Sequence, residues 1–103
     1  MWILQSAEER EADDSWTFRL AAGAIKTVGR APRADFIVDA ALVSRLHCRL
    51  TATDLNVEVV DLQSTNGTFV NGKRVAKAML AVGDRLRVGR VELLVGQKKP
   101  VES

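Results

Sequence analysis

The chain has 103 residues, the length of one domain, and 47% of them are hydrophobic, which excludes a disordered composition. Its 15 Lys and Arg side chains against 13 Asp and Glu leave a formal net charge of +2, too small a surplus to indicate nucleic acid by itself. A single cysteine excludes an internal disulfide, no apolar run approaches the ~20 residues of a transmembrane helix, and MWILQSAEER is unlike a secretory signal, so we expect a soluble intracellular protein.

Short apolar runs broken by turn-forming residues recur along the chain about every eight to twelve residues. Several of them alternate apolar and polar side chains with the period of a half-buried β-strand. This pattern is typical of an all-β sandwich or barrel, and no helical pattern competes with it. In chain order the predicted strands are residues 1–4, 16–20, 24–29, 35–38, 46–52, 56–62, 67–70, 73–75, 84–89 and 91–95.

Charged or turn-prone segments separate these runs. We expect a loop at 8–14 (EEREADD), a hairpin turn within 51–56 (TATDLN) and tight turns at 81–84 and 88–91. The segment 73–80 (KRVAKAML) has room for one helical turn at most. The fold prediction is therefore a sandwich of two antiparallel sheets with about eleven short strands and the binding loops at one end. The domain is expected to span residues 1–97, with 98–103 as a polar tail or the start of a linker.

Three loops concentrate residues that bind anions, namely 29–35, 42–45 and 63–67. Guanidinium groups form charge-assisted, forked hydrogen bonds with phosphate oxygens, and hydroxyl and turn N–H groups add further donors. If these loops share one end of the sandwich, they build an anion site. The side chains concerned are Arg30, Arg33, Ser44, Arg45, Ser64, Thr65 and Asn66.

Three short motifs in this region, taken together, resemble a known signature. They are Gly29-Arg30, then SRLH at 44–47, then STNGTFVNG at 64–72. Each motif alone is common, but their order and spacing on an all-β background resemble the forkhead-associated (FHA) domain. The resemblance extends from about Ile25 to Val95. It implies an eleven-stranded β-sandwich whose apical loops bind phosphothreonine peptides.

The resemblance also implies a role for each matching residue. Arg30 is expected to contact the phosphate with its guanidinium group, and Ser44 with its hydroxyl. Arg45 is expected to add a backbone N–H and its side chain. Thr65 is placed beside the phosphate, and Asn66 is expected to hold the peptide main chain beside the phosphothreonine.

A second group of matching residues is implied to shape the loops. His47 is expected to tie the binding loops together through hydrogen bonds, and Gly29 and Gly67 to allow the backbone path. Asn71-Gly72 has the sequence of a two-residue hairpin turn with positive φ at both positions. The first Asn-Gly pair, Asn66-Gly67, is thus interpreted as part of the ligand-binding loop, and the second as an ordinary turn.

Members of the family differ in the residue they prefer three positions after the phosphothreonine. An acidic preference there goes with a basic side chain shortly before the serine that matches Ser44. The residues at that place are AALV, 40–43, so an acidic preference by this route is not expected and an apolar one is.

The residues argue against an enzyme, a metal site or a cofactor. Ser44 and His47 are three apart, which on a strand would direct them to opposite faces, and no acid is suitably placed to complete a catalytic group. Cys48 alternates with apolar neighbours and is expected in the core. One His and one Cys are too few for a zinc site, and the glycine-containing stretches do not match a phosphate-binding nucleotide loop.

The leading interpretation is a non-catalytic module that binds a threonine-phosphorylated protein, with a serine/threonine kinase upstream. The alternative on the same fold is a phospho-independent interaction or dimerisation through a sheet face. Nucleic-acid binding would need aromatic stacking platforms, whereas most of the aromatics fall on core-facing positions, and no membrane contact is expected. Location would be cytoplasmic in a bacterium, with a nuclear location open in a eukaryote.

Overall fold

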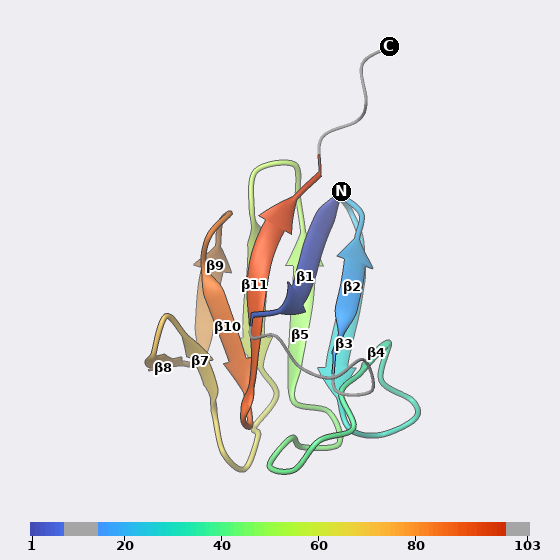
Figure 1. Ribbon diagram of the computed structural model, residues 1–103, viewed down its shortest axis with the longest axis vertical. Helices are drawn as coiled ribbons and strands as arrows, with labels where there is room; N and C mark the ends of the chain where they lie inside the picture. Colours follow the sequence, from blue (N-terminus) through green and yellow to red (C-terminus); the bar gives the residue numbers. More distant parts are fainter. Residues whose placement is uncertain (8–14, 99–103) are drawn as a thin grey trace.

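The computed structural model of the protein describes residues 1–7 and 15–98, which form eleven β-strands and no helix (Figure 1). No described segment is therefore a helix that could cross a membrane. The strands are β1 (Trp2–Ser6), β2 (Thr17–Leu20), β3 (Ile25–Gly29), β4 (Phe36–Ile37), β5 (Cys48–Ala52), β6 (Val57–Asp61), β7 (Thr68–Val70), β8 (Lys73–Val75), β9 (Lys77–Leu80), β10 (Arg85–Val88) and β11 (Val91–Gln97).

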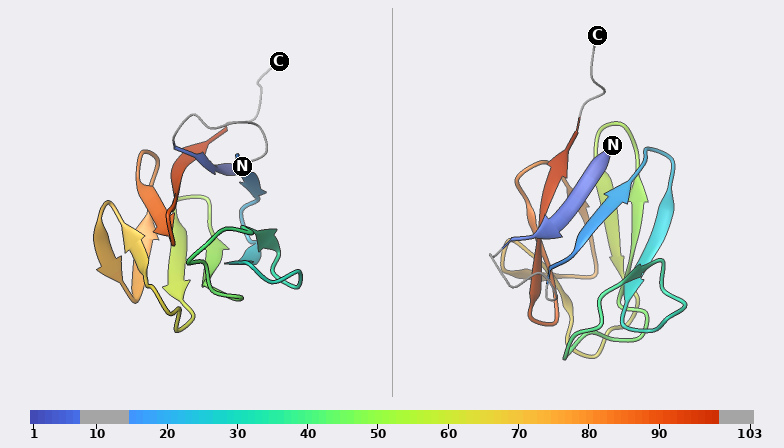
Figure 2. Two further views of the ribbon diagram at one scale, coloured as in Figure 1. Left: turned by 60° about the horizontal axis from the view of Figure 1, so that its bottom comes forward. Right: turned by 45° about the vertical axis from the view of Figure 1, so that its right-hand side comes forward.

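The strands form two sheets that pack face to face, as the alternating pattern predicts (Figure 2). One sheet has the order β2-β1-β11-β10-β7-β8 and the other β4-β3-β5-β6-β9. All pairs are antiparallel except β3 and β4, where Val28 pairs with Phe36 and Gly29 with Ile37 in parallel. The parallel pair arises because the loop 30–35 carries the chain back beside β3, where the Thr27 hydroxyl and N–H bond Asp35.

The core lies between the sheets and is built from every second residue of the strands. Leu50, Val59, Leu86 and Leu93 are fully buried, while their chain neighbours face outward. Cys48 also lies in this core, as its alternation predicts. Burial of such side chains supplies the main drive for folding, at about 25 cal/mol per Å² of apolar surface.

The two sheets are joined differently at their two lateral edges. On one edge the rings of Phe18 and Phe36 stack across the sandwich, with centroids 4.6 Å apart. On the other edge the chain passes from β8, in the six-stranded sheet, to β9, in the five-stranded sheet, through Ala76 alone. The predicted strand 73–75 is confirmed as β8, and the segment 73–80 contains no helical turn, because each half of it finds its hydrogen-bond partners in a different sheet.

The predicted turns are in place. Asn71 and Gly72 have φ angles of 51° and 84° between β7 and β8, which confirms the two-residue hairpin with positive φ at both positions. The predicted loop 8–14 and, apart from Lys98, the predicted tail 98–103 lie outside the described residues. Figure 1 shows the loops after β3, β4 and β6 together at one end of the sandwich, with Met1 and Lys98 at the other.

Candidate functional site

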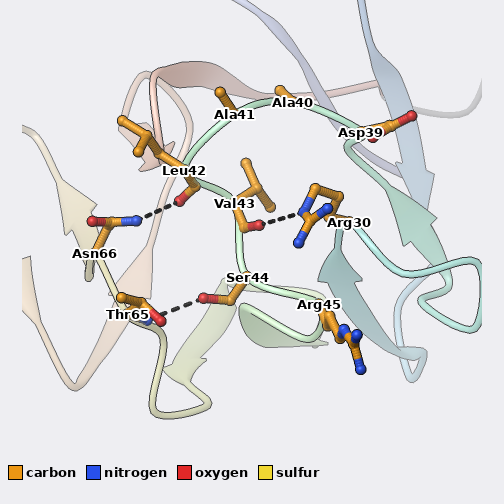
Figure 3. A pocket seen from close by; sticks show the side chains of 10 residues that line it. All are labelled: Arg30, Asp39, Ala40, Ala41, Leu42, Val43, Ser44, Arg45, Thr65 and Asn66. Carbon is orange, nitrogen blue, oxygen red and sulfur yellow. Dashed lines mark hydrogen bonds between the residues drawn. The ribbon is translucent and has the colours of Figure 1, made fainter.

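A cavity of about 560 Å³ opens at the end of the sandwich where three loops meet (Figure 3). It brings together residues that are far apart in the sequence, from the loop after β3, the long connection between β4 and β5, and the loop after β6. It contains all five residues predicted to bind a phosphopeptide. The lining residues are Arg30, Asp39, Ala40, Ala41, Leu42, Val43, Ser44, Arg45, Thr65 and Asn66.

Close contact between two backbones fixes the first two loops against each other. The N–H of Arg30 donates to the Ser44 carbonyl at 2.9 Å, and that of Ala31 to the Arg45 carbonyl at 3.1 Å. A Cβ atom on Gly29 would collide with the Arg45 carbonyl oxygen and lie 2.7 Å from its carbon. Gly29 is thus required by close approach, since its φ is not among the positive ones.

The guanidinium group of Arg30 is hydrogen-bonded through Nε, and its two terminal nitrogens are left without a partner in the described part of the chain. Nε donates to the Val43 carbonyl at 3.1 Å, which orients the guanidinium group toward the cavity. Among the described residues, the two terminal nitrogens of Arg30 have no hydrogen-bond partner and its charge has no ion-pair partner. Figure 3 shows the Asp39 carboxylate directed away from this group. A positive fork therefore faces the cavity unpaired.

Ser44 stands at the centre of the cavity wall. Its Oγ accepts a hydrogen bond from the N–H of Thr65 at 3.0 Å, which ties the second loop to the third. Because this contact uses Oγ as an acceptor, the hydroxyl hydrogen stays available to donate to a ligand oxygen. Thr65 itself is exposed beside it.

His47 is fully buried beneath the loops and uses both ring nitrogens. Nδ1 accepts from the N–H of Ser44 at 3.1 Å, and Nε2 lies 2.8 Å from the Gly67 carbonyl oxygen. A backbone N–H can only donate, so we assign the proton to Nε2, which donates to Gly67.

This geometry corrects one step of the sequence argument. Ser44 and His47 lie in a turn before β5 rather than on a strand, so they do meet. The contact runs from the Ser44 backbone, however, and the imidazole lone pair is already occupied by it. His47 therefore does not act as a base toward the Ser44 hydroxyl, and it connects two loops.

Asn66 is exposed at the opposite side of the cavity from Arg45. Its Nδ2 donates to the Leu42 carbonyl at 3.1 Å, which bridges the second and third loops. Leu42 has a φ of 71°, which a branched side chain rarely adopts, so this bond helps to hold an unfavourable backbone conformation. The Oδ1 atom of Asn66 has no partner among the described residues.

Asp61 is a loop-organising residue that the sequence reasoning missed. Its carboxylate accepts from Ser64 Oγ at 2.5 Å and Ser64 N–H at 3.2 Å, and from Thr68 Oγ1 at 2.7 Å. Ser64 Oγ in turn accepts from the N–H of Gly67 at 3.0 Å. Burial alone would raise the pKa of Asp61, but the hydrogen bonds from Ser64 and Thr68 outweigh it and lower the pKa. The spacing of Asp61 and Ser64, a carboxylate three residues before a hydroxyl at a turn, is the signal that was available.

Gly89, in the turn between β10 and β11, is a second supporting residue that the sequence reasoning missed. A Cβ there would lie 2.9 Å from the Ala41 carbonyl oxygen and 3.0 Å from the Leu42 carbonyl carbon. The turn therefore forms the floor under the loop that carries Leu42.

A second hollow of about 540 Å³ adjoins the first. It shares Arg30 and Arg45 with the first cavity and adds Ala31, Pro32 and Arg33. Of the predicted anion-binding residues, Arg33 and Ser64 lie outside the first cavity. Arg33 is next to it, whereas Ser64 is buried with its Oγ bonded to Asp61 and Gly67.

The described residues contain no group of three or more His, Cys, Asp or Glu side chains that could hold a metal ion. Burial raises the pKa of the Cys48 thiol to about 12, so the thiolate form that binds metals and attacks electrophiles is suppressed.

Comparison with known proteins relates the chain to one family. Residues 26–89 match the FHA domain family. The chain is 41% identical to the ABC transporter ATP-binding/permease protein Rv1747 of Mycobacterium tuberculosis over 78 residues, and 40% identical to the glycogen accumulation regulator GarA of that organism over 78 residues. These matches cover 76% and 74% of the chain but only 9% of the transporter and 48% of the regulator.

Among solved structures, an FHA domain studied for its phosphothreonine-dependent interactions superposes with a TM-score of 0.80 at 32% identity. That match covers 97% of this chain and 98% of the solved one.

Proposed function

The chain belongs to the forkhead-associated (FHA) domain family, and on this premise we propose that it is a non-catalytic module that binds phosphothreonine-containing segments of other proteins. The observation that carries the proposal is the unpaired guanidinium edge of Arg30 in a cavity that also presents the hydroxyl of the neighbouring Ser44. A phosphate group would neutralise the charge of Arg30 and accept from Ser44 at the same time.

The remaining predicted residues complete this arrangement. We assign Arg45, which lines the cavity, to a further phosphate contact, and Thr65 to the space beside the phosphate. Asn66 is assigned to the partner's main chain, because its free Oδ1 can accept from a backbone N–H while Nδ2 stays bonded to Leu42. Gly29, His47 and Gly67 position these groups.

The action we propose is binding without chemistry. His47 has both nitrogens engaged, and Cys48 is buried with a raised pKa, so neither supplies a base or a nucleophile to the cavity. The partner is then a protein phosphorylated on threonine, which places a serine/threonine kinase upstream. The partner's phosphorylated segment must lie in the same compartment as the chain, which we propose to be the cytoplasm if the protein is bacterial.

The test is a titration of the wild type and of Arg30→Ala with an oriented library of threonine-phosphorylated peptides. Loss of the guanidinium group is expected to weaken binding by roughly 2–5 kcal/mol, about 30-fold to several-thousand-fold, because the phosphate loses its charge partner. Arg19→Ala, an exposed arginine on β2, is the control for the loss of one positive charge. Binding is also expected to weaken below about pH 6, where the phosphate takes up its second proton, and at high salt.

A folded wild type that binds no phosphopeptide would contradict the proposal and favour a contact through a sheet face. Ile25 and Met79, on the five-stranded sheet, are 60% and 57% exposed and would be the place to look for such a contact. Nucleic acid is a weaker candidate. Trp2 and Phe36 are buried, and Arg87 covers one face of the Phe69 ring at 4.0 Å, so these rings do not form a row of open stacking platforms.

A further inference from the structure

We propose that Arg33, together with Arg30 and Arg45, forms a second anion subsite that accepts an acidic or second phosphorylated residue of the partner, close in sequence to the phosphothreonine. The inference rests on the proposed function, since it concerns the same bound segment. It adds a residue, Arg33, and a selectivity that neither the family match nor the cavity around Ser44 assigns.

The position of the second hollow supports a subsite on one continuous path. Its lining has five residues, and three of them are arginines. Arg30 and Arg45 line both hollows, so a chain whose phosphate lies at Arg30 needs little length to reach Arg33. At about 3.3–3.6 Å per extended residue, one to three residues span roughly 3–11 Å, which sets the expected separation.

The charge of this hollow is not balanced by the protein. No carboxylate lines it, and among the described residues neither Arg33 nor Arg45 has an ion-pair partner. The acidic residue nearest to Arg33 in the sequence, Asp35, is committed elsewhere. Its carboxylate accepts from the N–H of Thr27 at 2.9 Å and from its hydroxyl at 3.2 Å, which holds the pKa of Asp35 below its usual value. With the phosphothreonine phosphate bound at Arg30 and Arg45, a second anion would therefore still meet the unbalanced charge of Arg33, with no carboxylate in the described lining of the hollow as a competitor.

The backbone that carries these arginines is fixed before a ligand arrives. Residues 31–34 form a β-turn in which the N–H of Ala34 donates to the Ala31 carbonyl at 3.0 Å. Pro32 occupies the second position of this turn, where its fixed φ is favourable, and Arg33 follows at the tip. Ala34 is buried, and the Ala31 N–H bonds the Arg45 carbonyl, so the turn is anchored on both sides. A prepared site loses less entropy on binding.

The location also separates this subsite from the selectivity for the third residue after the phosphothreonine. That selectivity involves the segment 40–43, which lines the first cavity and contains no basic residue. The second hollow contains none of those residues. Guanidinium forks bind carboxylates and phosphates alike, so both are candidate ligands, and the doubly charged phosphate should bind more strongly.

The test uses fluorescently labelled peptides built on one phosphothreonine with otherwise uncharged flanks. A Glu, a phosphoserine or a neutral Gln is placed at each of the three positions before and after the phosphothreonine. Each peptide is titrated against the wild type, Arg33→Gln and Arg19→Gln. Arg33 and Arg19 are both exposed, and each variant removes one positive charge, so Arg19→Gln controls for net charge.

We expect Glu at one or two positions on one flank to strengthen wild-type binding about threefold to tenfold, and phosphoserine there to strengthen it more. Arg33→Gln should abolish most of this gain and leave the affinity of the uncharged-flank peptide within about twofold of the wild type, whereas Arg19→Gln should retain the gain. A gain that is equal in the wild type and both variants would overturn the subsite and leave phosphothreonine binding intact. Absence of binding by every phosphopeptide would overturn both proposals.

Discussion

The imidazole of His47 uses both of its nitrogens on backbone groups from two different loops, the N–H of Ser44 and the carbonyl of Gly67. Ser44 in turn bonds the third loop, because its Oγ accepts a hydrogen bond from the N–H of Thr65. Ser44 and Thr65, which line the first cavity, are thus connected to His47, which does not line it. A single sequence indicates that a buried histidine has partners, but it does not say which backbone groups they are, because one of them comes from a loop twenty residues away.

Asp61 holds the third loop by accepting hydrogen bonds from Ser64 and from Thr68. Asp61→Ala would leave the fully buried hydroxyl of Thr68 and the hydroxyl of Ser64 without their acceptor. Losing these bonds is expected to lower the free energy of unfolding by about 1–3 kcal/mol at pH 7. Urea denaturation followed by tryptophan fluorescence measures it, with the exposed Asp54→Ala as control.

The pH dependence of that difference follows from the sign of the pKa shift. The pKa of Asp61 is lower in the folded protein than its ordinary value of 3.8, so the ionised carboxylate favours the folded state. Its contribution is complete well above pH 3.8 and is lost as pH falls through the folded-state pKa. The gap between wild type and Asp61→Ala should therefore narrow below about pH 4. A gap that stays constant down to about pH 2 would show that charge has no part in it.

At the scale of elements, the two Asn-Gly pairs of STNGTFVNG have different functions. Asn71-Gly72 closes the β7–β8 hairpin, and a Cβ on Gly72 would meet nothing within 4 Å. Gly67, in the third loop, instead packs against the side chain of Arg74 on β8, and a Cβ on the glycine would lie 2.7 Å from the Arg74 Nε. The same dipeptide thus makes a hairpin turn in one place and lies in a cavity-lining loop in the other.

Gly72→Ala tests the hairpin alone. The residue has a φ of 84°, so an alanine there is strained although it has space, and we expect a loss of about 1–2 kcal/mol in the free energy of unfolding. Phosphopeptide affinity should not change, because the turn lies outside the first cavity. Thermal unfolding and a peptide titration on the same sample separate the two effects, and a weakened affinity would argue against our placement of the site.

Gly29→Ala tests the opposite case to Gly72→Ala. The φ of Gly29 is not in the left-handed region, but there is no room for a Cβ atom. The new methyl group would press on the Arg45 carbonyl and the Leu46 Cα, and so separate the first loop from the second. We expect both stability and phosphopeptide affinity to fall, the affinity by about tenfold or more, because Arg30 and Ser44 lose their alignment. Comparison with Gly72→Ala controls for a generic Gly-to-Ala effect. A variant that binds like the wild type would contradict the need for this close approach.

For the whole molecule, the alternation of apolar residues was enough to predict two packed sheets, and their inner faces are the buried residues of β5, β6 and β11. It did not predict which sheet receives each strand. Residues 77–80 illustrate this, since an alanine-containing segment with no strong strand preference becomes β9 only because β6 offers it an edge. The parallel pairing of β4 was equally hidden, since it depends on the path of a loop.

The candidate site was predictable in its composition and not in its geometry. The residue types of Arg30 and Ser44 pointed to a phosphate site, and the resemblance to the FHA family pointed to Asn66 as a contact to the peptide main chain. The hydrogen bond from Asn66 to Leu42, and the turn at Gly89 beneath it, join segments more than twenty residues apart and appear only in three dimensions. The hollow at Arg33 was also not predictable, because the sequence does not show that Arg33 and Arg45, from two different loops, line the same hollow.

The described ends of the chain meet at the pole opposite the loops, where the N–H of Lys98 donates to the Met1 carbonyl at 2.8 Å (Figure 1). A tag, a bead or a neighbouring domain attached at either end would therefore be held away from the cavity, and the recognition surface would stay open to solvent. Because its two described ends are adjacent, the domain is also suited to insertion into a surface loop of a host protein. The two ends of the host loop would join it at neighbouring points, and the cavity at the far pole would face away from the host.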